Sequence, residues 1–272
     1  MELPELTILS EQMRKEITGK GISEAEVKNP KCLNMPLKEF RERLLYKTVR
    51  SVKNKGKWIF IGVEPDNILL FNPGMGVDIL YFKPEDSIPD KYHIKIVFGD
   101  RTGFTVRVWW FCYLHIVSEV GLKEHKVVGR LGVNPLDDGF DLEEFQRLVE
   151  KGRGNVKSFL MDQKNIAGIG NVYIQDILFN AKVHPLRRIS SLSQHEVEAL
   201  YESMRMVLKE SIKLGGLAYE KDFYGRKGGY GVEHFKVAYK EGRPCPECGE
   251  TIMKIRTGST GSFVCLKCQP LL

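Results

Sequence analysis

The chain has 272 residues, of which 42% are hydrophobic and 28% charged, and its net charge is +6. This length suits two domains, and the composition is that of a globular protein with enough apolar residues for sizeable cores. The sequence contains no run of about 18 apolar residues, which excludes an ordinary membrane-spanning helix. The N-terminal residues Met1–Glu5 are acidic where a signal peptide would be basic, and no apolar segment follows. We therefore expect a cytoplasmic protein.

The first half of the chain reads as one helix followed by strands. Leu6, Leu9, Met13 and Ile17 recur at helical spacing and Gly19 follows them, which predicts a helix over residues 6–18. From about residue 57 the apolar period changes to two, and Pro or Gly separates successive runs. These runs cover residues 58–63, 68–71, 77–82, 93–98 and 104–117. Five strands in succession favour an antiparallel sandwich or barrel.

After about residue 125 the pattern becomes helical. Asp141 with Glu144, and Ser193 with Glu196, have the spacing of helix N-terminal capping motifs. Two short helices are predicted at 156–163 and 172–181, and the helix that starts near Ser193 ends before Gly215. Residues 217–239 are polar and Gly-rich with few apolar residues, which predicts a mobile surface loop.

Charge and cysteines are concentrated near the C-terminus. From Arg205 onward the chain has twelve Lys and Arg against seven Asp and Glu. This excess is a weak indication of a polyanionic partner, and a solvated charged face explains it as well. The chain also has two C-x2-C pairs separated by 16 residues, a spacing that predicts a closed four-thiolate zinc site with a structural role. The four ligands are Cys245, Cys248, Cys265 and Cys268.

The remaining two cysteines, Cys32 and Cys112, are isolated in the sequence. We expect them to pack as small apolar residues.

Three stretches of sequence together point to a known family. They are the N-terminal Glu2-Leu3-Pro4-Glu5, the stretch from Leu160 to Tyr173 with its Ile166-Ala167-Gly168-Ile169-Gly170-Asn171, and the lead-in Val237–Cys245 to the two cysteine pairs. In this order they resemble the formamidopyrimidine-DNA glycosylase / endonuclease VIII family, over nearly the whole chain. The middle stretch resembles the helix–two-turn–helix of that family.

The resemblance implies an α+β fold in two lobes, with DNA in the cleft between them. The first lobe is an N-terminal helix with an antiparallel β-sandwich, and the second is helical and carries the zinc ribbon. We expect a β-sandwich catalytic domain at residues 1–120, a helix–two-turn–helix DNA-binding domain at 121–235 and the ribbon at 236–272. The expected partner is double-stranded DNA with a damaged base or an abasic site, bound by a monomer.

The resemblance also assigns catalytic positions. In the family an N-terminal proline amine attacks C1′ of the damaged nucleotide, whereas the aligned residue here is Met1, which Glu2 follows directly. A primary α-amine has an ordinary pKa of about 7.7–8.0 and can form an imine, so strand cleavage stays chemically open. Glu2 matches the acid that protonates the sugar, and Glu5 matches a second acidic position. Both could also be ordinary carboxylates at a helix N-terminus. Lys57 matches a hairpin lysine that contacts the phosphate beside the lesion.

Three further positions resemble residues that fill the gap in the base stack. Met75, after Asn72-Pro73-Gly74, matches the residue that enters the vacated space. Trp109 stands where the family has an arginine, and Phe111 keeps the family's phenylalanine. An indole cannot make bidentate contacts to the orphaned base but can stack on a base, at about 1–3 kcal/mol. Buried core tryptophans are the alternative interpretation.

The second lobe supplies the expected phosphate contacts. Lys157 and Asn171 match phosphate-contacting positions, and Asn171 follows a turn at a helix N-terminus, which is a ready anion site. The ribbon has Thr260 where the family has an arginine, and Arg256 is a candidate substitute. The loss of a bidentate phosphate clamp should weaken DNA binding and reduce its salt dependence. Residues 221–230 resemble the loop that closes over an extruded oxidised purine.

We expect a base-excision repair glycosylase that removes a damaged, oxidised base, with AP lyase activity through the N-terminal amine as a further possibility. The altered positions at Met1, Trp109 and Thr260 support an alternative, a catalytically impaired protein of the same fold that binds damaged DNA. A zinc-ribbon RNA-binding or transcription factor would explain the ribbon and the charge but not the N-terminus.

Overall fold

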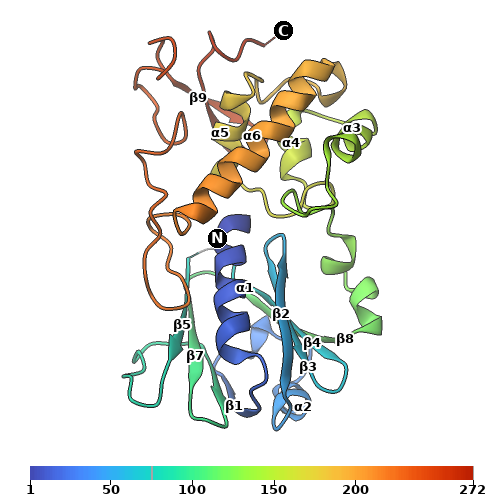
Figure 1. Ribbon diagram of the computed structural model, residues 1–272, viewed down its shortest axis with the longest axis vertical. Helices are drawn as coiled ribbons and strands as arrows, with labels where there is room; N and C mark the ends of the chain where they lie inside the picture. The colour runs from blue at the N-terminus through green and yellow to red at the C-terminus, as the bar shows by residue number, and fades with distance from the viewer. Residues whose placement is uncertain (75, 272) are drawn as a thin grey trace. The chain divides into compact units, whose positions relative to one another are not determined.

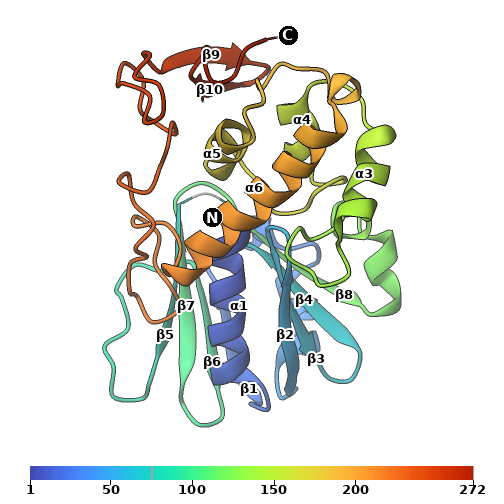
Figure 2. The ribbon, with the colours of Figure 1, turned by 45° about the horizontal axis from the view of Figure 1, so that its top comes forward.

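The computed structural model of the chain describes residues 1–74 and 76–271. They form two compact units (Figures 1 and 2). Unit 1 consists of Met1–Arg130 and Leu214–Gly229, and unit 2 consists of Leu131–Lys213 and the chain from Tyr230 onward. The three-part division predicted from the sequence stays a prediction. Within the described ranges, no helix has the length and apolar character needed to cross a membrane.

Unit 1 begins with α1 (Leu3–Ile17), three residues earlier than the sequence predicts. The predicted apolar stripe is buried, and Glu2 and Glu5 form a capping box at its start. Arg14 and Lys15 in the last turn suit the negative end of the helix dipole. Helix α1 runs alongside the sandwich with its N-terminus at one end of the strands, so it places the chain terminus at that end (Figure 1).

The rest of unit 1 is a sandwich of two four-stranded antiparallel sheets. One sheet has the order β1 (Ile22–Val27), β6 (Ile94–Phe98), β7 (Gly103–Val108), β5 (Val77–Phe82). The other has the order β2 (Val49–Lys55), β3 (Trp58–Val63), β4 (Asn67–Asn72), β8 (Tyr113–Ser118). Alternating apolar residues of both sheets form one core with the buried face of α1. The predicted antiparallel sandwich is confirmed.

Three elements of unit 1 lie outside the sequence prediction, namely β1, β2 and α2 (Leu37–Leu44). The predicted long strand 104–117 is also wrong, because it is two strands, β7 and β8, with an aromatic loop between them. Short 3-10 turns complete the unit at η1 (Pro30–Cys32), η2 (Val120–Glu124) and η3 (Val128–Arg130).

Unit 2 is helical and ends in a two-stranded ribbon. Its elements are α3 (Leu142–Glu150), α4 (Val156–Met161), α5 (Tyr173–Asn180), η4 (Ile189–Ser191), α6 (Gln194–Lys213), β9 (Met253–Thr257) and β10 (Thr260–Val264). Both predicted caps are present: Asp141 accepts a hydrogen bond from the Glu144 amide at 2.8 Å, and the Ser193 amide donates to Glu196 at 2.8 Å. The predicted helix pair at 156–163 and 172–181 corresponds to α4 and α5, which are slightly shorter.

Residues 214–229 are irregular, as predicted, but they are fastened to unit 1. Leu217 and Phe223 are buried apolar residues within a polar stretch. The Phe223 amide donates to the Gln12 side chain at 2.8 Å, and the Phe223 carbonyl accepts from the Tyr81 amide at 2.8 Å. The expectation of few apolar anchors is therefore wrong for this half of the predicted loop.

Candidate active site and nucleic-acid interface

Met1 presents its backbone rather than its thioether. Its side chain is fully buried and packs against the sandwich core, while the residue as a whole is half-buried. The exposed part of Met1 is therefore the terminal backbone, which carries the α-amine. The amine lies 3.3 Å from Oε1 of Glu220, which belongs to the fastened segment of the same unit. The Met1 thioether therefore does not occupy the space around the amine.

Glu2 and Glu5 lie beside this amine and are both buried, with 6% and 4% of their surface exposed. Glu5 accepts hydrogen bonds from two backbone amides, that of Glu2 at 2.8 Å and that of Leu217 at 3.1 Å. One carboxylate therefore holds both the start of α1 and the segment that carries Glu220. Both carboxylate oxygens of Glu5 thus accept hydrogen bonds from backbone amides.

Lys57 lies in the two-residue turn between β2 and β3, where Lys55 pairs with Trp58. Gly56 has φ of 56°, the left-handed conformation that such a tight turn needs. The strand residue Asn54 is bonded to Ser10 at 2.9 Å and to Thr7 at 3.2 Å, both on α1. The hairpin is thus tied to the first turns of α1, and the β2–β3 turn lies at the same end of unit 1 as the chain N-terminus (Figure 1). Lys57, in this turn, is half-buried.

The aromatic loop, residues 109–111, is exposed. Trp109, Trp110 and Phe111 have 52%, 77% and 53% of their surface accessible, which excludes the alternative of buried core tryptophans. The guanidinium of Arg107 lies 4.6 Å from the centre of the Trp109 ring, and this contact orients the indole. Three consecutive exposed aromatic rings are unfavourable in water and are typical of a surface that contacts a partner.

The aromatic loop lies next to the loop after β4. The Trp109 amide donates to the Gly76 carbonyl at 3.0 Å, and the Gly74 backbone packs so closely on the Phe111 carbonyl that a Cβ would be 2.1 Å from its oxygen. Only glycine fits there. The structure therefore brings together the two loops that the resemblance pairs, although Met75 itself lies outside the described residues.

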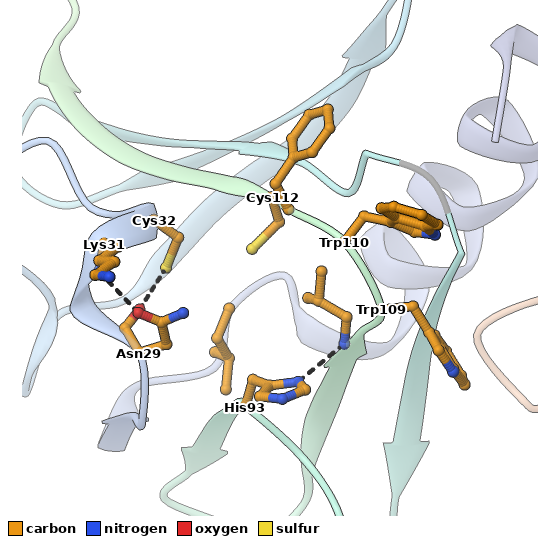
Figure 3. Close-up of a pocket in the computed structure, with 10 residues that line it drawn as sticks. Asn29, Lys31, Cys32, His93, Trp109, Trp110 and Cys112 are labelled. Atoms are coloured by element: carbon orange, nitrogen blue, oxygen red, sulfur yellow. Dashed lines mark hydrogen bonds between the residues drawn. The ribbon is translucent and has the colours of Figure 1, made fainter.

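A cavity of about 350 Å³ opens beside the aromatic loop (Figure 3). Trp109, Trp110 and Phe111 form part of its wall, and His93 contributes a polar group. Nδ1 of His93 accepts a hydrogen bond from the Val108 amide at 3.0 Å, so a neutral His93 carries its proton on Nε2. Cys32 and Cys112 also line this cavity.

In unit 2, Lys157 is directed at the ribbon. Only 2% of its surface is exposed, and burial lowers its pKa from 10.5 to about 8. Its Nζ lies within 3.0 Å of four oxygens of the β9–β10 hairpin, which are Thr257 Oγ1, Thr260 Oγ1, Gly261 O and Ser262 Oγ. An ammonium has three donors. These hairpin oxygens therefore account for the full hydrogen-bonding capacity of Lys157.

Asn171 lies just before α5 and is half-buried. Gln175, one turn later, donates to the carbonyl of Asn171 at 2.9 Å and to its side-chain oxygen at 3.2 Å. Oε1 of Gln175 accepts from the Phe263 amide of β10 at 3.0 Å. A single buried glutamine thus connects the helix–two-turn–helix to the ribbon.

Thr260 and Arg256 lie on opposite faces of the hairpin. Thr260 pairs with Thr257, and both hydroxyls face Lys157, whereas Arg256 pairs with Gly261. Because side chains alternate along a strand, Arg256 points away from the Lys157 face. Arg256 is exposed and its Nε contacts only the Gly258 carbonyl of its own turn, at 3.4 Å, among the described hydrogen bonds. The Arg256 side chain therefore lies on the other face of the hairpin from the side chain of residue 260, where the family has its arginine.

The four ribbon cysteines converge on one point, with all four Sγ atoms within 4.8 Å of one another. Two of these distances are 3.8 Å, between Cys245 and Cys268, and 3.4 Å, between Cys248 and Cys265. A tetrahedron with metal–sulfur bonds of 2.3 Å has edges of about 3.8 Å. The cluster therefore has the geometry to bind a metal ion.

Comparison with known proteins identifies the family. Residues 1–108 match the model of the formamidopyrimidine-DNA glycosylase N-terminal domain, and residues 131–222 match that of the formamidopyrimidine-DNA glycosylase H2TH domain. The chain is 30% identical to the formamidopyrimidine-DNA glycosylase of Streptococcus pneumoniae, covering 98% of both proteins, and 31% identical to that of Listeria innocua, covering 98% of this chain and 99% of the relative. The chain belongs to the formamidopyrimidine-DNA glycosylase family.

Solved structures of the family have the same fold. The MutM (Fpg) protein of Thermus thermophilus superposes with a TM-score of 0.86 at 26% identity, over 99% of this chain and 98% of that one. The Lactococcus lactis Fpg in a complex with DNA containing an abasic site superposes with a TM-score of 0.89 at 25% identity, over 99% and 100%. The predicted two-part α+β fold, with its sandwich, helical part and four-cysteine cluster, is confirmed.

Sequence reasoning missed the partners that hold the site residues. Glu220, which pairs with the Met1 amine, lies in a polar stretch with no motif to single it out. Gln175 and Ser262 are polar residues inside a helix and a strand, and only their burial, at 1% each, shows their importance. Gln269 is also fully buried, and it joins the Cys265 amide to the Val183 carbonyl. No local pattern reveals such long-range contacts.

Proposed function

We propose that this glycosylase removes an oxidised base from duplex DNA and then cleaves the strand through the Met1 amine. Family membership makes the protein a base-excision repair DNA glycosylase. The lesion class, the lyase step and the residue roles below are the proposal. The proposal also includes that the protein acts as a monomer in the cytoplasm, as expected from the sequence alone.

The arrangement at the N-terminus supports the proposal most. The thioether of Met1 is buried in the core, so the accessible group at the terminus is an amine, as in a family whose nucleophile is an N-terminal amine. The buried carboxylates of Glu2 and Glu5 lie at the same helix start. The proposed nucleophile, the Met1 amine, and the proposed acid, Glu2, thus both lie directly before the first turn of α1.

The proposed reaction uses these groups in order. The ammonium of Met1 gives a proton to Glu220, 3.3 Å away, and becomes nucleophilic. Its nitrogen bonds to C1′ as the bond from C1′ to the damaged base breaks, and the base leaves with the electron pair and takes up a proton. The nitrogen then loses a second proton, Glu2 gives a proton to the sugar oxygen, and the ring opens to leave a protonated imine.

DNA contacts are proposed for both units. In unit 1, Lys57 meets the phosphate beside the lesion, and Trp109 and Phe111 stack on exposed bases, which their accessible rings allow. In unit 2, Asn171 and the turn before α5 meet a phosphate. For Lys157 we propose a positioning role, because its ammonium is buried against the ribbon hairpin.

We also propose that the four-cysteine cluster holds zinc. Thiolates alone, at tetrahedral spacing, are the donor set of a structural zinc site with no open position for water. Cys245, Cys248, Cys265 and Cys268 would hold the ion, and its contribution is folding energy for the ribbon.

Reductive trapping tests the lyase step. The protein is incubated with an abasic-site duplex and borohydride, and the covalent complex is digested and mapped by mass. We expect the adduct on the N-terminal peptide. Glu2→Gln should abolish release of an oxidised base from a lesion duplex while DNA affinity stays nearly unchanged, and a protein with an acetylated N-terminus is the control for trapping.

The outcomes separate the parts of the proposal. An adduct on a lysine instead of Met1 would remove the terminal amine from the mechanism. Base release without any adduct would leave a monofunctional glycosylase. Tight binding to the abasic duplex, with no base release from a panel of lesion duplexes, would establish the catalytically impaired DNA-binding protein instead.

A further inference from the structure

The cavity beside the aromatic loop contains a pair of cysteines that the proposed reaction does not use. Cys32 and Cys112 are 80 positions apart in the sequence, and both line this cavity (Figure 3). Cys32, at the end of η1, is half-buried, and Cys112, directly after Phe111, is buried. Their sulfur atoms face the same space between η1 and the start of β8 in Figure 3.

Backbone contacts hold the two cysteines side by side. Leu33 forms a bridge with Leu114, so the chain after Cys32 runs along the start of β8. Asn34 continues this pairing, because its side chain donates to the Ile116 carbonyl at 2.9 Å and accepts from the Ile116 amide at 2.9 Å. Both cysteines lie within two residues of the bridge. The fold therefore places the two cysteines on neighbouring stretches of backbone.

The two thiols face the same cavity, and they are not equivalent. The neighbouring Cys112 thiol lowers the pKa of Cys32, whereas the Cys32 thiol and burial raise the pKa of Cys112. Cys32 is also the more exposed of the two, and its thiol donates to the Asn29 carbonyl at 3.2 Å. A thiolate is the reactive form of cysteine, so Cys32 is the attacking group and Cys112 the resolving group.

We propose that Cys32 and Cys112 form a redox modification site, at which a peroxide converts the two thiols to a reversible disulfide. The Cys32 thiolate attacks one peroxide oxygen, the O–O bond breaks, and hydroxide or alkoxide leaves as Cys32 becomes a sulfenic acid. The Cys112 sulfur then attacks the Cys32 sulfur, the S–O bond breaks, and water leaves. The two thiols are oxidised by two electrons in total, and the peroxide is reduced.

The disulfide has a direct structural consequence. It would bond η1 to the residue that follows Phe111, and so tie the aromatic loop to the rest of unit 1. In the reduced protein this loop is held to its neighbours by non-covalent contacts, such as the one from the Trp109 amide to Gly76. The inference does not depend on the glycosylase activity, because it concerns only the chemistry of the two thiols.

Differential alkylation tests the proposal on the full-length, zinc-loaded protein. The protein is treated with hydrogen peroxide, free thiols are blocked, and the digest is mapped by mass before and after dithiothreitol. We expect one cross-linked peptide that joins Cys32 to Cys112, lighter by about 2 Da than the two reduced peptides and restored by the reductant. Mapping also separates this pair from the four ribbon cysteines.

Single variants assign the two roles. In Cys112→Ser, Cys32 should accumulate as a sulfenic acid that dimedone labels, whereas in Cys32→Ser the thiol of Cys112 should stay reduced at the same peroxide dose. Cys112→Ala serves as the second variant if the serine disturbs folding. Full alkylation of both thiols after peroxide treatment, or a cross-link from either cysteine to the ribbon instead, would overturn the proposal.

Discussion

Replacement of Lys157 by methionine tests how the ribbon is held in unit 2. The variant keeps the length and apolar stem of the side chain but removes the ammonium, whose four oxygen neighbours lie at 2.8–3.0 Å. Some of these oxygens keep other partners. Thr257 and Ser262 bond to each other at 2.8 Å, and Gly261 O accepts from Gln175 at 3.4 Å. Among the described hydrogen bonds, Lys157 is the only partner of the Thr260 hydroxyl.

The expected loss of stability follows from the hydrogen bonds that the hairpin oxygens lose. Hydrogen bonds from a charged donor contribute about 1.5–3 kcal/mol each, and a buried acceptor without a partner costs about 1–3 kcal/mol. Against this, methionine avoids the cost of burying an ammonium, which is several kcal/mol. We expect a net local destabilisation of about 2 kcal/mol, or roughly 30-fold faster amide exchange. Thr260→Val, which removes one acceptor, should lose about 1 kcal/mol.

Amide hydrogen exchange on zinc-loaded protein measures this directly. The amides of β9 and β10 should exchange faster in Lys157→Met, while those of β3 and β4 in unit 1 should be unchanged and serve as the internal control. If the ribbon amides of the variant exchange at the wild-type rate with full zinc content, Lys157 does not hold the hairpin and the reasoning fails.

Three further outcomes are expected. Glu220→Gln should slow borohydride trapping at Met1 by about 100-fold, which is the lower end of the effect of losing an acid–base group. DNA affinity should stay unchanged and serves as the control, and an unchanged trapping rate would remove Glu220 from the reaction. Between pH 8 and 10.5, Lys157 is protonated in the unfolded chain but has lost its proton in the folded chain. The free energy of unfolding of the wild type should therefore rise with pH across this window, relative to that of Lys157→Met. Urea titrations of both proteins at pH 8 and pH 10.5 measure this, and a difference that does not change with pH contradicts the lowered pKa. Removal of the ribbon metal by a chelator should abolish DNA binding but leave the fluorescence of the three tryptophans, all in unit 1, unchanged; intact binding after verified metal loss would refute this.

The sequence predicts elements well where one face is regularly apolar. The apolar stripe predicted for α1 is buried, and the predicted apolar runs correspond to strands β3 to β6. Strands β1 and β2 were missed because they are polar: β1 reads Ile-Ser-Glu-Ala-Glu-Val, and β2 contains three basic residues. Such strands are defined by their neighbours in the sheet rather than by their own pattern.

The aromatic loop shows a different limit. Residues 104–117 are apolar almost throughout, and such a run is usual for a buried strand. In the structure the middle of the run, Trp109 to Phe111, is exposed. Local pattern cannot distinguish an aromatic residue that packs in a core from one kept at the surface to meet a partner, because the residue types are the same.

The four clustered cysteines could be found because a metal site of this kind requires fixed spacing along the chain, and Glu2 and Glu5 could be found because the N-terminus resembles that of the family. Glu220 could not, because its role depends on a contact with Met1 across 219 positions of sequence. Thr260 and Lys157 are both candidates from the sequence, but the contact between them, across 103 positions, is seen only in the structure. Site residues that act through long-range pairs become visible only in the fold.

The positions that differ from the family pattern are nevertheless well integrated. At Met1 the new side chain is buried and the amine pairs with Glu220. At Trp109 the indole is stacked by Arg107, and at Thr260 the hydroxyl accepts from Lys157. Decay of an unused site leaves cavities and buried polar groups without partners, yet no buried side-chain nitrogen or oxygen in the described part of the chain lacks a hydrogen bond. Such compensation at three separate positions is expected of a site that still operates with altered residues, because a site under no selection has no reason to acquire matching partners.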